Sequence, residues 1–215
     1  MNNRFVFAAI FSLSAALVAV PAGAAPVVSV LATGLDSPKQ VTVSRDGSVY
    51  VALSGTAGPA DPLLAGIPAN RTGGVVKVSP AGTVTPVVSG LLSRFVEGSA
   101  TGPSGVAVVD ESLFVAQGLR DPLNSPAGQL LSSPVLKVDP SGKTRVYTSF
   151  DALPLDPPAN NALDTNPFAL AAGRDGTLYV SDGGENGVWL VDRSGDASLF
   201  VQFPGNPVVT GLAVP

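Results

Sequence analysis

The sequence contains no cysteine and no histidine among its 215 residues. Without cysteine no disulfide can form, so the fold must be stabilised by packing and hydrogen bonding alone. Without histidine, Ser-His-Asp and Cys-His catalysis and any His-ligated zinc or iron site are excluded. Charged residues make up only 13% of the chain, about half of the usual share. Apolar residues make up 45%, as expected for stacked β-sheets with little surface helix.

Motifs for nucleotide binding and for an activated nucleophile are missing as well. There is no P-loop and no G-x-G-x-x-G after an expected strand. Ser104 and Ser181 have no histidine that could activate them. The net charge is −4, and it falls to −5 without residues 1–24, which contain one Arg and no acidic residue. This acidic balance argues against nucleic acid and anionic membrane surfaces as partners.

Residues 1–24 have the three parts of a secretory signal peptide. Arg4 precedes an apolar run of about 16 residues, and Ala22-Gly23-Ala24 forms an A-x-A cleavage site. The alternative is a membrane anchor, but a spanning helix needs roughly 20 apolar residues. The sequence therefore predicts a secreted or periplasmic protein without membrane association after cleavage. We expect cleavage after Ala24, with Ala25 as the second candidate.

The remaining residues repeat a unit of four expected strands, named A to D here. β-Branched and aromatic residues mark the strands, and tight turns separate A from B and C from D; all of these turns contain Gly except Asp110-Glu111. The fullest copy places the strands at 168–172, 177–180, 187–191 and 198–203. The first copy places them at 40–43, 48–52, 75–78 and 83–88. The second places them at 106–109, 113–116, 135–138 and 144–150, and a further strand A is expected at 208–214.

Each copy begins just after a proline, at positions 38, 103, 167 and 207. The shortest spacing, 40 residues, fits a propeller blade of about 40–45 residues. The sequence therefore predicts an all-β fold, a β-propeller with three full four-stranded blades and parts of another. The expected blades are 36–91, 92–150 and 164–204, with a partial blade from 205, inside a domain of residues 25–215. A β-sandwich is the alternative.

The segment 27–35 resembles the expected strand D around 87–91. An N-terminal strand of this kind could complete the last blade of a propeller. A closed ring needs at least four blades, so the sequence predicts either a truncated chain or closure by self-association with another copy.

The long connections all fall at one end of the expected blades. In an up-and-down sheet, the B–C and D–A connections share an end, and here they span 54–74, 117–134 and 149–166. Loops on a rigid scaffold commonly carry binding residues. We therefore expect a ligand-binding face at this end, formed by side chains with carboxylate or amide oxygens: Asn160, Asn161, Asp164, Asn166, Asp182 and Asn186.

These oxygens suit Ca²⁺, which takes 6–8 oxygen ligands. The other interpretation is that the Asp and Asn side chains bind the local backbone and that glycines serve the turns. Asp164 and Asp182 are the one pair that could do acid–base chemistry. Trp189 and Phe200 are expected to pack between blades. No catalytic residue and no cofactor other than Ca²⁺ is predicted.

Four stretches resemble the ScyD/ScyE family, whose members are exported bacterial proteins related to NHL-repeat propellers. They are residues 35–38, 98–106, 164–168 and 180–186, and the resemblance extends over most of 27–214. The most specific parts are the Asp-Thr-Asn-Pro and Asp-Gly-Gly-Glu-Asn segments. The family is associated with biosynthesis of the pigment scytonemin, and membership implies no established reaction. Family members have further blades, which this chain lacks.

The resemblance implies a binding or scaffold module that presents one loop-rich face to a small molecule or a protein. The alternative is a metal-dependent hydrolase or lactonase, like the gluconolactonase-type propellers, with Asp164, Asn166 and Asp182 as oxygen ligands. A third interpretation is a non-functional remnant. The absence of a catalytic motif favours the non-enzymatic role.

Overall fold

The computed structural model describes residues 27–61, 69–118, 133–150 and 165–214. The chain divides into two units, Met1–Val30 and Leu31–Pro215, and every strand belongs to the second. Of the first unit only residues 27–30 are described, and they form no strand. The predicted leader and both cleavage positions lie outside the described residues. In the described part of the chain, no helix is long and apolar enough to cross a bilayer.

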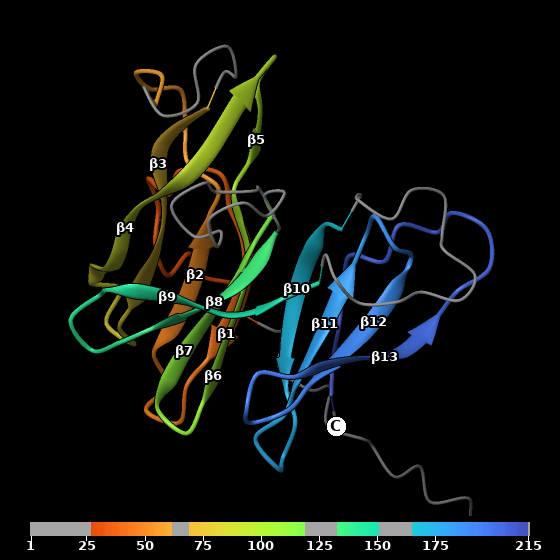
Figure 1. Ribbon diagram of the computed structural model, residues 1–215. Helices are drawn as coiled ribbons and strands as arrows, with labels where there is room; N and C mark the ends of the chain where they lie inside the picture. Colours follow the sequence, from red (N-terminus) through yellow and green to blue (C-terminus); the bar gives the residue numbers. More distant parts are fainter. Residues whose placement is uncertain (1–26, 62–68, 119–132, 151–164, 215) are drawn as a thin grey trace, which may run out of the picture. The chain divides into compact units, whose positions relative to one another are not determined.

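Three antiparallel sheets follow one another along the second unit (Figure 1). The first contains β1 (Pro38–Val43), β2 (Val49–Leu53), β3 (Ala69–Val78), β4 (Val84–Val96) and β5 (Ser99–Thr101). The second contains β6 (Pro103–Val109), β7 (Ser112–Gln117), β8 (Pro134–Val138) and β9 (Thr144–Ser149). The third contains β10 (Pro167–Ala172), β11 (Leu178–Asp182), β12 (Gly187–Val191) and β13 (Ala197–Gln202). In each sheet the strands lie in chain order, which confirms the predicted A-to-D unit in all three copies.

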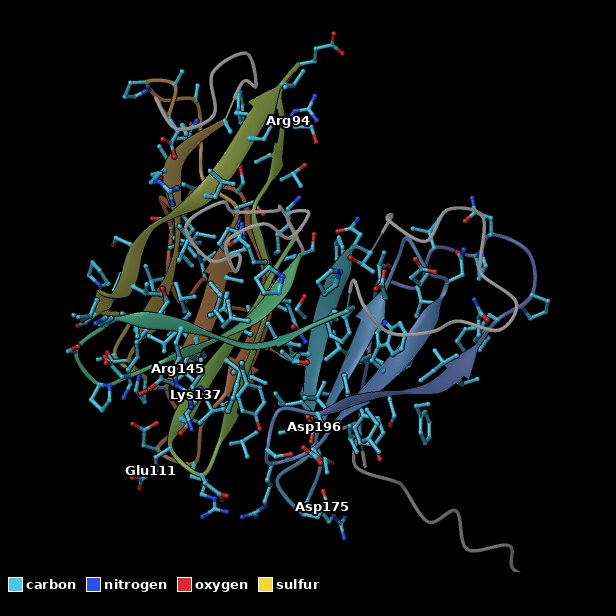
Figure 2. The ribbon with its side chains drawn as sticks, viewed as in Figure 1. Arg94, Glu111, Lys137, Arg145, Asp175 and Asp196 are labelled. Atoms are coloured by element: carbon cyan, nitrogen blue, oxygen red, sulfur yellow. The ribbon has the colours of Figure 1, made fainter. Side chains whose placement is uncertain are left out.

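Tight turns at one end of the sheets have a shared construction. A glycine with positive φ sits in five of them, at positions 47, 82, 142, 176 and 195. An Asp carboxylate accepts the backbone N–H two residues later in four, from Asp46, Asp139, Asp175 and Asp192. Glycine adopts positive φ without a steric penalty, and Asp closes such turns by binding the local backbone. We call this end of the sheets the turn end; Figure 2 shows Glu111 and Asp175 there.

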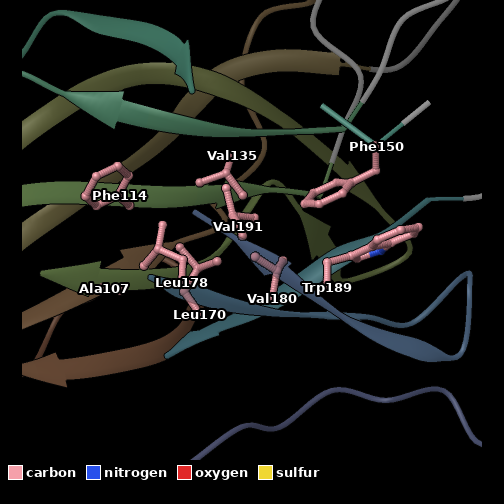
Figure 3. Packing of buried hydrophobic residues seen from close by; sticks show 10 residues of the cluster. Ala107, Phe114, Val135, Phe150, Leu170, Leu178, Val180, Trp189 and Val191 are labelled. Atoms are coloured by element: carbon pink, nitrogen blue, oxygen red, sulfur yellow. The ribbon is translucent and has the colours of Figure 1, made fainter. Parts of the chain in front are cut away.

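The middle sheet is buried on both faces, and this decides how the sheets are stacked. Phe114 and Val115 are neighbours on β7, so their side chains point to opposite faces. Phe114 packs with residues of the third sheet in one cluster (Figure 3), whereas Val115 packs with residues of the first sheet in another. A sandwich of two sheets has no such middle layer, so the sandwich alternative is wrong.

The first strands of the three sheets meet along one line. The side chain of Gln40 on β1 donates to the carbonyl oxygen of Leu170 on β10 at 2.7 Å. Its Oε1 accepts the N–H groups of Val106 on β6 and Leu170, both at 2.9 Å. Successive sheets that pack face to face, with their first strands converging, are the blades of a β-propeller. The predicted fold class is confirmed, with blade 1 formed by β1–β5, blade 2 by β6–β9 and blade 3 by β10–β13.

Two parts of the predicted blade pattern differ from the structure. Residues 92–101 were expected in blade 2, but they extend blade 1, because Glu97 and Gly98 form a two-residue turn with φ of 51° and 81° between β4 and β5. The strand expected at 208–214 is not formed. There the backbone N–H of Val208 donates to the side chain of Asn186 at 3.0 Å and not to a strand.

Candidate functional site

Buried polar side chains gather at the end of the blades opposite the tight turns, which we call the loop end. Among the described residues, Ser48 is the one buried polar side chain at the turn end. The loop end holds Ser54, Asp61, Asn70, Ser93, Ser104, Gln117, Ser133, Thr148, Thr165, Ser181, Asp182, Glu185 and Asn186. Buried polar groups of this kind form hydrogen bonds that fix the geometry of nearby backbone. The loop end is therefore the part of the fold in which polar groups hold the connections in place.

Asp182, at the end of β11, is fully buried and is the centre of the largest of these networks. Its Oδ1 accepts the backbone N–H groups of Asn166, Gly184 and Glu185 at 2.7, 3.0 and 3.1 Å. Its Oδ2 accepts the indole N–H of Trp189 at 3.2 Å. The carboxylate thus joins the start of β10, the loop after β11 and the middle of β12.

Burial raises the pKa of the Asp182 carboxyl above its usual range, although the four N–H donors act in the opposite direction. Removing a carboxylate from water disfavours its charged form, whereas hydrogen bonds to that form favour it. The side chain has no exposed surface and both of its oxygens accept hydrogen bonds from the protein. Asp182 therefore fixes the backbone of the loop, and neither of its oxygens is exposed in a position to bind a metal ion.

Asn186 is also buried and holds the chain that follows blade 3. Its Oδ1 accepts the N–H of Val208 at 3.0 Å, and its backbone oxygen accepts the N–H of Phe203 at 2.9 Å. Its φ of 55° lies in the left-handed region, which Asn tolerates better than most residues. The amide is therefore used to fix backbone.

Asn166 is half-buried and lies directly before β10. Its backbone oxygen accepts the N–H of Gly183 at 3.0 Å, and its N–H donates to Asp182. The prediction that the segments around 166 and 184 share one end of the sheet is confirmed. Of the six predicted ligand residues, the structure brings together Asn166, Asp182 and Asn186.

The other three predicted ligand residues, Asn160, Asn161 and Asp164, lie outside the described residues. The predicted acid–base pair of Asp164 and Asp182 is therefore not placed. Within the described ranges, no group of three or more Asp or Glu side chains is arranged to hold a metal ion.

Hydrogen bonds at the loop end also join one blade to the next. Ser54 donates to the carbonyl oxygen of Pro103 at 2.9 Å, linking blade 1 to blade 2. Ser104 donates to the carbonyl oxygen of Pro167 at 2.9 Å, linking blade 2 to blade 3. Two of the four prolines that mark the repeats, Pro103 and Pro167, thus accept a hydrogen bond from a serine of the preceding repeat. For Ser104, the sequence suggested only a nucleophile without an activating histidine, and nothing in it pointed to this link between blades.

A second polar network at the loop end was also missed. The side chain of Asn70 binds the backbone of Thr56 and Thr72 at 3.0 and 3.1 Å. Arg71, which lies between Asn70 and Thr72 in the sequence, pairs with the buried carboxylate of Asp61 at 2.7 Å. The run Asn70-Arg71-Thr72 at the start of an apolar strand was the available signal, because three polar residues in succession rarely begin a buried strand without partners.

A cavity of about 470 Å³ opens at the turn end, not at the loop end. Val43 of blade 1, Val108 of blade 2 and the ring of Tyr50 contribute apolar surface to its wall. Lys77 also lines it, and its ammonium group pairs with Asp46 at 3.0 Å. That pairing contributes to a lowered pKa of Asp46, whose largest cause is the hydrogen bond from Ser44. The binding face expected from loop length and this hollow therefore lie at opposite ends of the blades.

No protein-family model matches the chain, and no curated protein matches it. Solved structures do resemble it. A gluconolactonase from Xanthomonas campestris is 24% identical over 80% of this chain and 49% of its own, with a TM-score of 0.45. A catalytically inactive virginiamycin B lyase from Staphylococcus aureus, solved with quinupristin, is 15% identical over 80% of this chain and 42% of its own, with a TM-score of 0.42.

The chain spans about half of the length of these two solved structures or less, 49% and 42%. At these identities the activities named for those proteins are not transferred to this chain.

Proposed function

We propose that the chain is an exported propeller module of ScyD/ScyE type that binds a small molecule or a protein at its loop end and catalyses no reaction. The observation that supports this proposal most is the use of Asp182. A buried carboxylate that accepts four N–H groups stiffens the connections around it. Preorganised loops lower the entropic cost of binding.

The same observation weakens the hydrolase alternative. A lactonase of the expected kind would need Asp164, Asn166 and Asp182 to present oxygens to one metal ion. Asp182 directs both oxygens at protein N–H groups, and Asn186 directs its oxygen at the backbone of Val208. Neither side chain presents an oxygen that is unused by the protein, so we propose no reaction.

Thermal unfolding with and without Ca²⁺ separates the two proposals. A calcium site filled at a hundred times its Kd adds about 2.7 kcal/mol, which for a chain of this size raises Tm by roughly 5–10 °C. We expect no change in Tm at millimolar Ca²⁺, and no Ca²⁺-dependent hydrolysis of a sugar lactone in a pH-stat assay. A clear rise in Tm together with lactone turnover would overturn the binding-module proposal.

Binding itself can be followed through the single tryptophan of the chain. Trp189 is 1% exposed and donates to Asp182, so its fluorescence reports on the loop end. In a titration with a panel of soluble sugars and aromatic compounds, a ligand of the loop end should change this fluorescence. Replacement of Ser104 by Ala should weaken its binding, whereas Asp175→Ala, at the turn end, should not. Loss of binding in the turn-end variant alone would contradict the proposal.

The proposed export has its own test. The protein expressed with its leader should be recovered from the periplasm or medium, and mass spectrometry should find Ala25 as its first residue. A first residue of Pro26 would indicate cleavage at the second candidate position. Recovery of the uncleaved chain with the membrane fraction would support the anchor alternative.

A further inference from the structure

The junction between successive blades is built in the same way twice. The outer strands β4 and β9 each contain a bulge, at Val87 and Tyr147. The backbone oxygen of each bulge residue lies against a turn glycine of the following blade. A Cβ atom added at Gly142 would lie 2.7 Å from the oxygen of Val87, and one added at Gly195 would lie 2.5 Å from that of Tyr147. The side chains of both bulge residues pack against the cluster between the blades.

The inner part of each junction also repeats. Val106 on β6 pairs with Val115, and Leu170 on β10 pairs with Val180, so the two residues occupy matching positions. They are 0% and 2% exposed, because each packs into the cluster shared with the preceding blade. Val41 on β1 has the same position, since it pairs with Val51.

Blade 1 and blade 3 each have one face that no other described blade covers, which we call the flank. The flank of blade 1 exposes the inner-strand half of this junction, and the flank of blade 3 exposes the bulge half. On blade 1, Val41 is 52% exposed and Val43 is 66% exposed. On blade 3, Phe200 lies in the bulge of β13, at the position of Val87 and Tyr147, and is 60% exposed. Phe200 packs edge-on against Tyr179 with ring centroids 5.3 Å apart, as Tyr147 packs against Phe114 at 4.7 Å.

The segment 31–35 already occupies the outer position on the flank of blade 1. The backbone oxygen of Leu31 would lie 2.7 Å from a Cβ at Gly82, the same contact that Val87 makes with Gly142. Ala32 and Leu35 pack against the buried face of blade 1, as Val88 and Leu91 pack against blade 2. Among the described residues, the segment has no backbone hydrogen bond in a strand or turn, so little holds it besides these side chains.

We propose that blade 3 of one copy of this chain docks on the flank of blade 1 of a second copy. Phe200 of the incoming copy takes the place of Leu31, and its blade covers Val41 and Val43. The contact is the blade junction that the chain builds twice within itself, with one half supplied by each copy. This assembly does not depend on the binding role proposed above.

A second copy is the occupant that the surfaces favour, because each copy carries both halves of the junction. The docking is head to tail, and it closes into a ring when the rotation from copy to copy closes. Two copies related by a twofold axis are the smallest such ring, and in it both flanks of each copy are covered. The displaced segment 31–35 loses only the packing of a few side chains. Two apolar faces that are exposed by more than half at their central residues are covered in exchange.

Sedimentation velocity over a range of concentrations tests the proposal on the protein expressed with its leader and processed by the host. We expect a reversible dimer. Phe200→Asp and Val41→Asp should each weaken dimerisation by at least about a hundred-fold, because each places a charge in both junctions of the pair. Arg145→Asp should have no effect, since Arg145 is exposed on β9 of the middle blade, which takes part in neither contact between the copies.

A mixing experiment separates this junction from unspecific apolar association. The Phe200→Asp chain keeps an intact blade 1 flank, and the Val41→Asp chain keeps an intact blade 3 flank. An equimolar mixture should therefore form a detectable mixed dimer through one intact junction, although each variant alone is monomeric. A monomeric unsubstituted protein at all concentrations would overturn the proposal. So would a dimer that neither substitution weakens, or variants that do not complement each other.

Discussion

At the scale of single residues, Asp182 is the side chain on which the loop end depends most. Four N–H groups from three segments converge on its two oxygens. The N–H donors of a buried site need an acceptor, and removal of the acceptor leaves each of them unsatisfied. Stability at this end should therefore respond strongly to a change at position 182.

We expect Asp182→Asn to lower the free energy of unfolding by about 1–3 kcal/mol, because its amide nitrogen would face the indole N–H of Trp189. Burial raises the pKa of Asp182 in the folded state above its ordinary value of 3.8. The folded state thus holds this proton more tightly than the unfolded state, so the contribution to stability falls as pH rises from 3.8 through the folded pKa. The stability difference between the unsubstituted protein and Asp182→Asn should shrink over that window.

Urea unfolding at a series of pH values measures this difference, in which the titration of the other carboxylates cancels. Trp189→Phe provides the matched partner, since it removes the donor that opposes the new amide. Asp182→Asn should cost less in the Trp189→Phe background than in the unsubstituted chain. A difference that grows with pH would show that the four hydrogen bonds outweigh burial.

The sequence could show that Asp182, Asn166 and Asn186 belong to one end of a blade, because strand order fixes which connections share an end. It could not show what their oxygens bind. An Asp after a strand in a Gly-rich loop has the same composition whether it faces a cation or its own backbone. The choice depends on burial and on the direction of the N–H groups around it, which only the folded chain determines.

At the scale of elements, the tight turn between β8 and β9 shows how a blade docks on its neighbour. Gly142 has a φ of 83° and its Cα faces the backbone oxygen of Val87 on the preceding blade. A side chain at this position is strained by its own backbone and also collides with the neighbouring blade. The two effects can be separated, because Gly90 has a φ of 76° with no atom within 4 Å of its added Cβ.

We therefore expect Gly142→Ala to lower the free energy of unfolding by about 2–4 kcal/mol, combining left-handed strain of about 1 kcal/mol or more with the displaced contact. Gly90→Ala should cost only the strain, about 1 kcal/mol. Chemical denaturation of the two variants gives the comparison. Equal losses would mean that the contact with Val87 adds nothing to blade packing.

Strand existence and order were accessible from the sequence because β-branched runs alternate with short turns that contain Asp, Gly or both in every copy. The hairpin of β4 and β5 was not predicted from the sequence, although Glu97-Gly98 is typical of a two-residue hairpin turn. Polar residues at Ser93, Arg94 and Ser99 interrupt the apolar pattern there, and the strand is held by pairing with β3 at Asn70 and by Ser93 donating to the oxygen of Ser54.

At the scale of the whole strand-bearing unit, Gln40 links all three blades through one side chain. Its amide binds the backbone of β6 and β10 as well as belonging to β1. Gln40→Leu keeps much of the volume but leaves three backbone groups without this partner. We expect a loss of about 3–5 kcal/mol in the free energy of unfolding, from roughly 1–3 kcal/mol for each group to the extent that it stays shielded from water.

Gln202→Leu is the control, because the Gln202 amide makes a single bond of 3.3 Å to the oxygen of Glu185 within blade 3. Calorimetry should find one cooperative transition in that variant. In Gln40→Leu the transition should move to lower temperature and broaden, as blades 1 and 3 lose their direct link. An effect of Gln40→Leu no larger than that of Gln202→Leu would count against a linking role.

The contact between bulge oxygen and turn glycine has a consequence for how such chains diversify. Its two partners are a backbone carbonyl oxygen and a glycine without a side chain. The contact between one blade and the next therefore depends on backbone geometry and not on side-chain identity. Val87 and Tyr147 differ in size and polarity, yet their carbonyls reach Gly142 and Gly195 alike. Tandem duplication of the gene segment that encodes one blade would therefore add a blade that packs on its neighbour without further substitutions. Later substitutions could then change the exposed residues at the turn end and the loop end.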